Sequence, residues 1–214
     1  FGALFGWQAR RAYNGIDLEF YKPIDTPRSD RFLFIARFSE IKGAYLAIGA
    51  CLQTGVGLDL IGDTTITNEP AYFQACVTLA EQQSPNWKGP GKQIRMIGNV
   101  SRGETVWWYS QAHCMLHPNQ IFREPFGLAP VEAMACGCPV IAWNYGAMRE
   151  TIKGAQYRLA NSFDEFVGMV KDHSHGYIGD ERGACQIVAS KFSVDAMCKG
   201  YEDLINEALS TGGW

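Results

Sequence analysis

EPFGLAPVEAMACGCPVIA, residues 124–142, is the stretch that decides the fold, because it joins a loop, a helix and a buried strand. Pro130 fits the first turn of a helix, where a missing backbone N–H costs no intrahelical hydrogen bond. Gly137, followed closely by Pro139, ends that helix. The apolar run 140–142 is typical of a buried strand. A strand, a loop, a helix and a further strand form the repeating unit of a parallel sheet covered by helices.

Two glutamates stand at the start of this helix. Glu124 lies in the loop before the helix and Glu132 lies in its opening turns. A helix N-terminus can bind phosphate oxygens through its free N–H groups and its positive dipole end, and a nearby carboxylate can accept two hydrogen bonds from a ribose diol. Phe126 and Gly127 allow the backbone to approach a ligand. A second interpretation stays open, in which Glu132 only complements the helix dipole and Glu124 is a solvated charge.

The segment FLFIARFSEIKG, residues 32–43, places two cations after an expected strand. Arg37 can deliver a planar guanidinium to a phosphate, and Lys42, just before Gly43, can add a point charge. Together they would neutralise a diphosphate leaving group without a metal. The alternative is a pair of solvated charges at a strand end.

Apolar runs alternate with amphipathic segments along the chain, which predicts an α/β fold with a Rossmann-like parallel sheet and helices on both faces. The expected strands are 32–36, 58–61, 94–97, 114–117 and 140–142. The expected helices are 43–52, 69–82, 105–111 after a capping box of Ser101 and Glu104, one starting at Ser162, and two closing helices at 183–192 and 193–209. Residues 83–91 and 172–180 are expected to be loops, the latter with His173 and His175 solvated.

Composition agrees with one globular domain in a reducing compartment. The 214 residues are 47% hydrophobic, and the net charge of −3 predicts no basic face for nucleic acid. Seven cysteines lack the spacing of a disulfide scaffold, and Cys136 and Cys138 do not form a paired metal motif. No apolar run approaches the roughly 20 residues that a membrane span needs. We expect no metal site and a cytoplasmic location, with peripheral membrane association left open for a longer protein.

These segments resemble the retaining glycosyltransferases of glycosyltransferase family 4. Glu124 and Glu132 match that family's signature of two glutamates separated by seven residues, and residues 32–43 match its arginine and lysine-glycine segment. Weaker matches lie at 14–17, 94–100 and 146–152. The resemblance runs from about Tyr13 to the C-terminal helices. It implies the C-terminal, donor-binding half of a GT-B enzyme, in which two Rossmann-like halves face each other across a cleft.

The resemblance also implies roles for individual residues. Catalysis would fall to Glu124, Arg37 and Lys42, and the nucleobase would rest near Gly98-Asn99-Val100. The full set expected to bind the donor is Glu132, Phe126, Gly127, Leu128, Gly98, Asn99 and Val100. His117 fits a structural role better than a donor contact. Departures from the family pattern are Asn119, where serine is common, Ala147, where a second glycine is common, and Arg123 beside Glu124.

The implied reaction moves a hexose from a nucleotide diphosphate sugar to a carbohydrate or lipid-linked acceptor, with retention of configuration and without a cofactor. The acceptor would bind through an N-terminal domain that this chain lacks. We expect a single donor-binding domain over 1–214, with a linker-like lead-in at 1–30 and a closing helix and tail at 193–214. Donor binding is therefore expected of this chain, whereas transfer by the chain alone is not.

Two other functions remain open. A sugar-nucleotide epimerase of the same architecture would use the same fold, and a non-catalytic module would keep the nucleotide pocket without transfer. A dinucleotide oxidoreductase is disfavoured, because no Gly-x-Gly-x-x-Gly segment follows the strand expected at 32–36.

Overall fold

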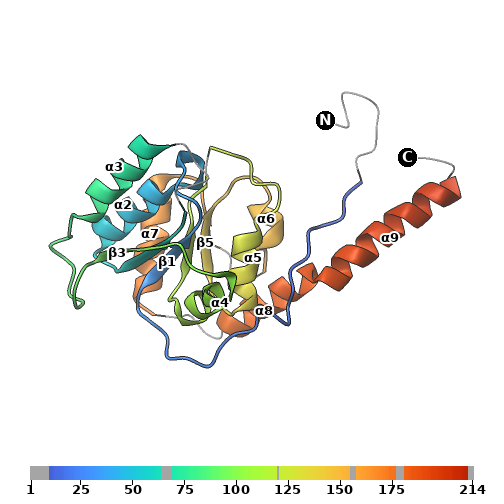
Figure 1. Ribbon diagram of the computed structural model, residues 1–214, viewed down its shortest axis with the longest axis horizontal. Helices are drawn as coiled ribbons and strands as arrows, with labels where there is room; N and C mark the ends of the chain where they lie inside the picture. The colour runs from blue at the N-terminus through green and yellow to red at the C-terminus, as the bar shows by residue number, and fades with distance from the viewer. Residues whose placement is uncertain (1–9, 64–68, 120, 155–157, 177–180, 212–214) are drawn as a thin grey trace.

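The protein is a doubly covered parallel sheet (Figure 1). The computed structural model describes residues 10–63, 69–119, 121–154, 158–176 and 181–211. The described strands are all parallel and lie in the order β3-β2-β1-β4-β5-β6. Their bounds are β1 Phe32–Ile35, β2 Leu58–Ile61, β3 Ile94–Gly98, β4 Met115–His117, β5 Val140–Trp143 and β6 Arg158–Ala160.

Helices cover both faces of the sheet, as Figure 1 shows. One face carries α2 Ala44–Thr54, α3 Pro70–Ala80 and α7 Phe163–Ser174. The opposite face carries α4 Arg102–Gln111, α5 Leu128–Ala135 and α8 Glu181–Ala189. The remaining helical segments are η1 Glu40–Lys42, α6 Met148–Thr151, η2 Ser190–Phe192 and α9 Val194–Thr211.

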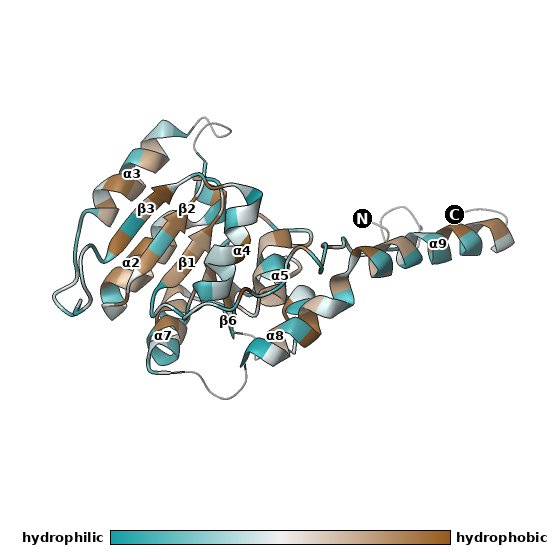
Figure 2. Ribbon diagram, turned by 60° about the horizontal axis from the view of Figure 1, so that its bottom comes forward, coloured by the Kyte–Doolittle hydropathy of each residue, from teal (hydrophilic) through white to brown (hydrophobic). Residues whose placement is uncertain are grey.

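Strand β1 shows why helices must pack on both faces of the sheet. Successive side chains point to opposite faces, so Phe32 and Phe34 enter the core under α2 and α7, whereas Leu33 packs into the core under α4 and α5. A strand in the middle of a parallel sheet is buried on both faces and therefore reads as a continuous apolar run. Figure 2 shows β1 as an apolar, brown strand in the middle of the sheet.

Most expected elements are confirmed, with ends shifted by at most three residues. Strand β2 has the predicted bounds, and the capping box forms, since the Ser101 hydroxyl accepts from the Glu104 N–H and the Glu104 side chain accepts from the Ser101 N–H. Ser162 caps α7 in the expected way. Strand β6 has no counterpart among the predicted strands, because three residues are too short to give a periodic signal and its place is set by pairing with β5.

The loop expected at 172–180 is wrong over its first residues, because α7 continues through Ser174. His173, expected to be solvated, has a fully buried side chain that lies against Phe32 and His113. It follows Phe166 and Val170 at helical spacing, which places it on the buried face of α7. His175 is exposed as expected, and residues 177–180 lie outside the described residues.

The C-terminal helix projects from the body of the protein (Figures 1 and 2). Helix α9 has no buried residue in its described part, and the lead-in runs beside it from Arg10, which pairs with Glu207. Ile16 forms an isolated parallel bridge with Ser193, which fixes the base of α9 to the lead-in. Among the described residues, no helix combines the length and apolar character that crossing a membrane requires.

A buried ion network ties the first three strands together. The Asp59 carboxylate in β2 is 1% exposed and accepts from Arg31 Nε at 2.9 Å and from Arg95 Nη2 at 2.5 Å. Arg31 Nη2 also donates to the carbonyls of Leu58 and Gln93, both at 2.8 Å. Each charge in the network therefore has a partner that offsets its loss of water.

Removing Asp59 should leave Arg31 buried without its counter-charge. We expect Asp59→Ala to lower the free energy of unfolding by about 3 kcal/mol, measured by urea unfolding monitored by circular dichroism. The matched control is Asp203→Ala, which breaks the exposed Lys199–Asp203 pair on α9 and should change stability by no more than about 0.5 kcal/mol. Equal urea midpoints for the two variants would contradict the stabilising contribution that is expected of the buried network.

Buried histidines should make the fold sensitive to acid. Burial lowers the pKa of His173 to about 3 and that of His117 to about 4, and it also lowers the pKa of His113. Imidazoles that are neutral in the folded state titrate near 6.5 once unfolded, so the unfolded state binds more protons below that pH. Stability is then complete above about pH 6.5 and falls as the pH drops toward the folded pKa values.

We expect the free energy of unfolding to fall between pH 7.5 and pH 5.5, with each of these histidines contributing roughly 1 kcal/mol. His173→Gln should lower absolute stability but reduce this pH difference by about its share. His175→Gln, at an exposed position of the same helix end, should leave the difference unchanged. Urea titrations at the two pH values give the measurement, and an undiminished difference in His173→Gln would refute the assignment.

Candidate active site

The candidate site lies where the direction of chain crossover reverses. From β1 the chain passes to β2 on one side, whereas β4, the other neighbour of β1, leads to β5 on the far side. The loops that leave the carboxyl ends of β1 and β4 therefore diverge, and such a switch point is where open parallel sheets bind ligands. Residues 36–43 and the described part of 118–127 form these two loops, and they contain most of the predicted site residues.

Lys42 and Glu124 meet across this switch point. Lys42 Nζ lies 2.5 Å from Glu124 Oε2, and their side chains are only 19% and 16% exposed. Gly43 makes the approach possible, because its φ of 76° favours glycine and an added Cβ would lie 2.3 Å from the Pro118 carbonyl oxygen. The structure thus joins two of the three predicted catalytic side chains.

The loop after β5 fixes the backbone of Glu124. The Ala147 N–H donates to the Glu124 carbonyl at 2.9 Å. Gly146 has φ 62°, and a Cβ there would lie 2.5 Å from the same carbonyl oxygen. Arg123 does not pair with Glu124; its guanidinium lies over the Tyr145 ring, 5.8 Å from the centroid. Glu124 therefore keeps Lys42 as its cationic neighbour.

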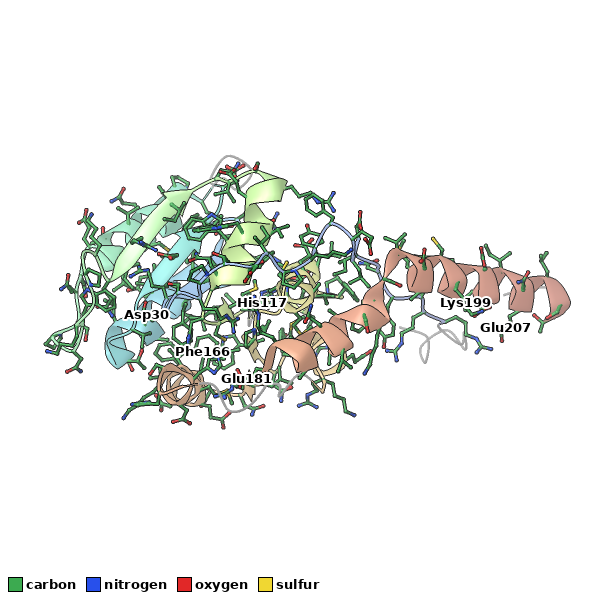
Figure 3. The ribbon with its side chains drawn as sticks, turned by 90° about the horizontal axis from the view of Figure 1, so that it is seen from below. Asp30, His117, Phe166, Glu181, Lys199 and Glu207 are labelled. Atoms are coloured by element: carbon green, nitrogen blue, oxygen red, sulfur yellow. The ribbon has the colours of Figure 1, made fainter. Side chains whose placement is uncertain are left out.

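Two polar side chains at the carboxyl end of β4, His117 and Asn119, interact with Glu124. Asn119 Nδ2 donates to Glu124 Oε2 at 3.1 Å, so Oε2 already has two donors. Burial lowers the pKa of His117 to about 4, and the imidazole is therefore neutral near pH 7. Figure 3 shows His117 in the interior of the molecule, in agreement with its expected structural role. Within the described part of the chain, His117 Nε2 and Asn119 Oδ1 are buried without a hydrogen-bond partner.

Helix α5 starts directly after the loop that carries Glu124. Leu128 and Ala129 occupy its first two positions, so their N–H groups have no intrahelical acceptor, and Pro130 follows in the first turn as expected. Gly127 has φ 87° and is buried, and it packs closely against Met148, since an added Cβ would lie 2.4 Å from the Met148 Cε. Phe126 is buried against Phe192, with ring centroids 5.3 Å apart, so its side chain belongs to the core.

Glu132 lies one turn further along α5 and faces α4. Tyr109 Oη is 3.4 Å from Glu132 Oε2, and the Tyr21 hydroxyl is a second donor to the same carboxylate. Burial raises the pKa of Glu132, while the two tyrosine hydroxyls and the charge of Arg102 act in the opposite direction. The carboxylate is thus half-buried and held by named partners, which differs from a solvated charge that merely complements a helix dipole.

The other predicted residues lie at the same edge of the sheet without joining the Lys42–Glu124 pair. Arg37 is exposed after β1, near Glu69, whose pKa is lowered by the Ser39 hydroxyl first, then by the Glu40 N–H and the charge of Arg37. Gly98 ends β3, Asn99 is exposed, and Val100 packs partly against the core, directly before the start of α4. Among the described residues, no group of three or more His, Cys, Asp or Glu side chains is arranged to hold a metal ion.

Sequence reasoning missed the side chains that hold the two glutamates. Tyr21, Arg102 and Tyr109 reach Glu132 from the lead-in and from α4, which are distant in sequence. Asn119 was noted only as a departure from a family pattern, yet it donates to Glu124. No local spacing could have found these partners, because packing of separate elements brings them together.

Comparison with known proteins places this arrangement in a family. A family model described as "Glycosyl transferases group 1" matches residues 22–165. D-inositol 3-phosphate glycosyltransferase 1 of Catenulispora acidiphila is 28% identical over 168 residues, which is 71% of this chain and 40% of that protein. Alpha-1,3/1,6-mannosyltransferase ALG2 of Saccharomyces cerevisiae is 23% identical over 235 residues, covering 91% of this chain and 46% of that protein. The chain thus spans less than half the length of these relatives.

Solved structures show the same fold. HepE of Anabaena in complex with UDP superposes with a TM-score of 0.76 at 21% identity, over 94% of this chain and 59% of that one. A C-terminal domain of a glycosyl transferase group 1 family protein from Francisella tularensis superposes with a TM-score of 0.62 at 20% identity, over 84% of this chain and 100% of that one. The Rossmann-like sheet is that of the C-terminal domain of GT-B glycosyltransferases. Because the family model covers more than half of its residues, the chain belongs to the glycosyl transferases group 1 family.

Proposed function

We propose that this chain is the donor-binding domain of a retaining glycosyltransferase of family 4. The whole enzyme would transfer a hexose from a nucleotide diphosphate sugar to a carbohydrate or lipid-linked acceptor. The observation that carries the proposal is the half-buried Lys42–Glu124 pair at the switch point, beside the start of α5. HepE of Anabaena, which shares the fold, is described in complex with UDP and with UDP-glucose, which supports a nucleotide sugar as the donor.

Each part of the donor has a proposed place. The diphosphate lies between Lys42, Arg37 and the first N–H groups of α5, since cations and a helix N-terminus together favour phosphate. The ribose diol bonds to Glu132, and the base rests near Gly98-Asn99-Val100. The sugar lies next to Glu124, whose Oε1 remains available because Lys42 and Asn119 already donate to Oε2.

Transfer in this proposal needs no metal or cofactor and no protein nucleophile. The bond between the anomeric carbon and the phosphate oxygen breaks as the acceptor oxygen attacks from the same face. The acceptor proton passes to the leaving phosphate, whose charge Lys42, Arg37 and the N–H groups of α5 stabilise. Glu124 stabilises the positive charge that develops on the sugar. The acceptor binds to a separate N-terminal half of the full-length enzyme.

A sugar-nucleotide epimerase remains the second candidate, and a non-catalytic nucleotide-binding module the third. The relatives named above are glycosyltransferases, which favours transfer. Assay of the full-length protein with donor but no acceptor separates the first two, because an epimerase would change the sugar under these conditions. A module would bind nucleotide in titrations and show no transfer in the full-length protein.

Lys42 should contribute to binding of the diphosphate in particular. In calorimetric titrations of this chain with UDP, GDP and ADP, we expect Lys42→Met to weaken binding of the preferred nucleotide about tenfold, by loss of one charge-assisted contact. Binding of the corresponding monophosphate should change much less. Lys199→Met removes an exposed lysine of α9 and serves as the matched control. Equal losses of affinity for the diphosphate and the monophosphate would contradict the placement of Lys42 at the diphosphate.

The two glutamates should separate into different roles. In the full-length enzyme, Glu124→Ala should reduce the rate of sugar transfer about 100-fold with little change in nucleotide affinity, because Glu124 acts on the sugar. Glu132→Ala should weaken nucleotide affinity about tenfold, by loss of charged hydrogen bonds to the ribose. Rates come from a transfer assay and affinities from calorimetry. The division of roles fails if both variants lose nucleotide affinity to the same extent.

A further inference from the structure

The Glu132 carboxylate is enclosed by side chains that no family signature assigns to it. The lead-in contributes Tyr21, which is 3% exposed, and α4 contributes Tyr109, which is 1% exposed, and Arg102. Cys136, the residue directly after α5, is a neutral thiol, since burial raises its pKa to about 12. Glu132 is therefore the one carboxylate in a cluster that also contains two phenols, a thiol and a guanidinium.

A tight turn fixes Tyr21 in this position. Asp17 Oδ1 accepts from the backbone N–H groups of Glu19 and Phe20, both at 3.0 Å, and the Asp17 carbonyl accepts from the Tyr21 N–H at 2.9 Å. The Arg102 guanidinium then covers the turn, lying 4.7 Å from the Phe20 ring centroid. The tyrosine hydroxyl is thus presented to α5 by a closed local structure.

The hydrogen bonds of Tyr21 have a direction. Arg102 Nε donates to Tyr21 Oη at 3.3 Å, so the phenol oxygen serves as an acceptor there. Burial raises the pKa of Tyr21 to about 12, so the hydroxyl retains its proton near pH 7. That proton is directed to Glu132, the second partner of the hydroxyl. A chain of donors therefore runs from Arg102 through Tyr21 to the carboxylate.

We propose that Tyr21 and Tyr109 are positioning residues that hold the Glu132 carboxylate ready to accept both hydroxyls of a ribose diol. An ionised carboxylate offers about four lone-pair sites. The two phenols occupy two of them, and two remain for the two hydroxyls of the diol. The phenols also keep a half-buried carboxylate in the ionised form, which is the form that accepts two hydrogen bonds.

This inference rests on the proposed function, because it assumes that Glu132 binds the ribose. It adds that the lead-in is part of the nucleotide site. It also adds that recognition of the diol depends on a residue more than 100 positions away from Glu132 in the sequence.

The test compares a ribonucleotide with the same nucleotide lacking its diol. Calorimetry would measure the affinity of this chain for the best-binding of UDP, GDP and ADP, and for the 2′,3′-dideoxy form of that nucleotide. In the unchanged protein, the dideoxy form should bind about 100-fold more weakly, since two hydrogen bonds to a charged group are lost. Tyr21→Phe should weaken the ribonucleotide about tenfold and leave the dideoxy form unchanged.

Matched variants control for general effects. Tyr13→Phe removes the same hydroxyl from the same lead-in, where it bonds Glu150 instead, and should bind both nucleotides like the unchanged protein. Tyr109→Phe should act in the same sense as Tyr21→Phe, because its hydroxyl lies 3.4 Å from Glu132 Oε2. Each substitution keeps the aromatic ring, and thermal unfolding checks that each variant is folded.

The outcomes separate the inference from the proposed function. If Tyr21→Phe and Tyr109→Phe bind both nucleotides like the unchanged protein, or lose affinity for both forms equally, the positioning role is overturned while the nucleotide site stands. If the unchanged protein binds the ribonucleotide and its dideoxy form equally, the assignment of Glu132 to the ribose fails. If no nucleotide binds, the proposed function itself fails for this chain.

Discussion

The position of β1 between β2 and β4 is the constraint on which the rest of the structure depends. Both faces of β1 are buried, so helices must cover the sheet on both sides, and the chain must cross over in opposite directions on either side of this strand. The loops after β1 and β4 diverge as a result. Gly43 then lies against the carbonyl of Pro118, and this close approach brings Lys42 to Glu124.

Two acidic groups at this edge experience different surroundings. Glu124 lies beside a lysine and an amide, both of which donate to its Oε2. Glu132 lies between helices, where burial raises its pKa and tyrosine hydroxyls oppose that shift. Both glutamates come from one short stretch of sequence, yet the loop before α5 places Glu124 at the switch point, whereas α5 itself directs Glu132 toward α4. In the proposed function, two glutamates near one helix start therefore contact two different parts of the donor.

Much of the fold could be predicted from the sequence, because its signals are local. Apolar runs located five of the six described strands, and the side-chain caps at Ser101 and Ser162 marked helix starts. The failures had a different cause. Strand β6 is defined by pairing with β5, and the burial of His173 depends on which face of α7 meets the sheet, so neither could be read from neighbouring residues.

The sequence by itself determined the class of the fold, the order of its elements and the residues at the switch point, since turn chemistry and apolar periodicity are written in local spacing. Only the tertiary structure decided which of these residues meet. Lys42 contacts Glu124, Arg37 stands apart from that pair, and Phe126 turns into the core. It also decided that Tyr21, Arg102 and Tyr109 surround Glu132, because contacts between the lead-in, α4 and α5 arise from packing of segments that are far apart along the chain.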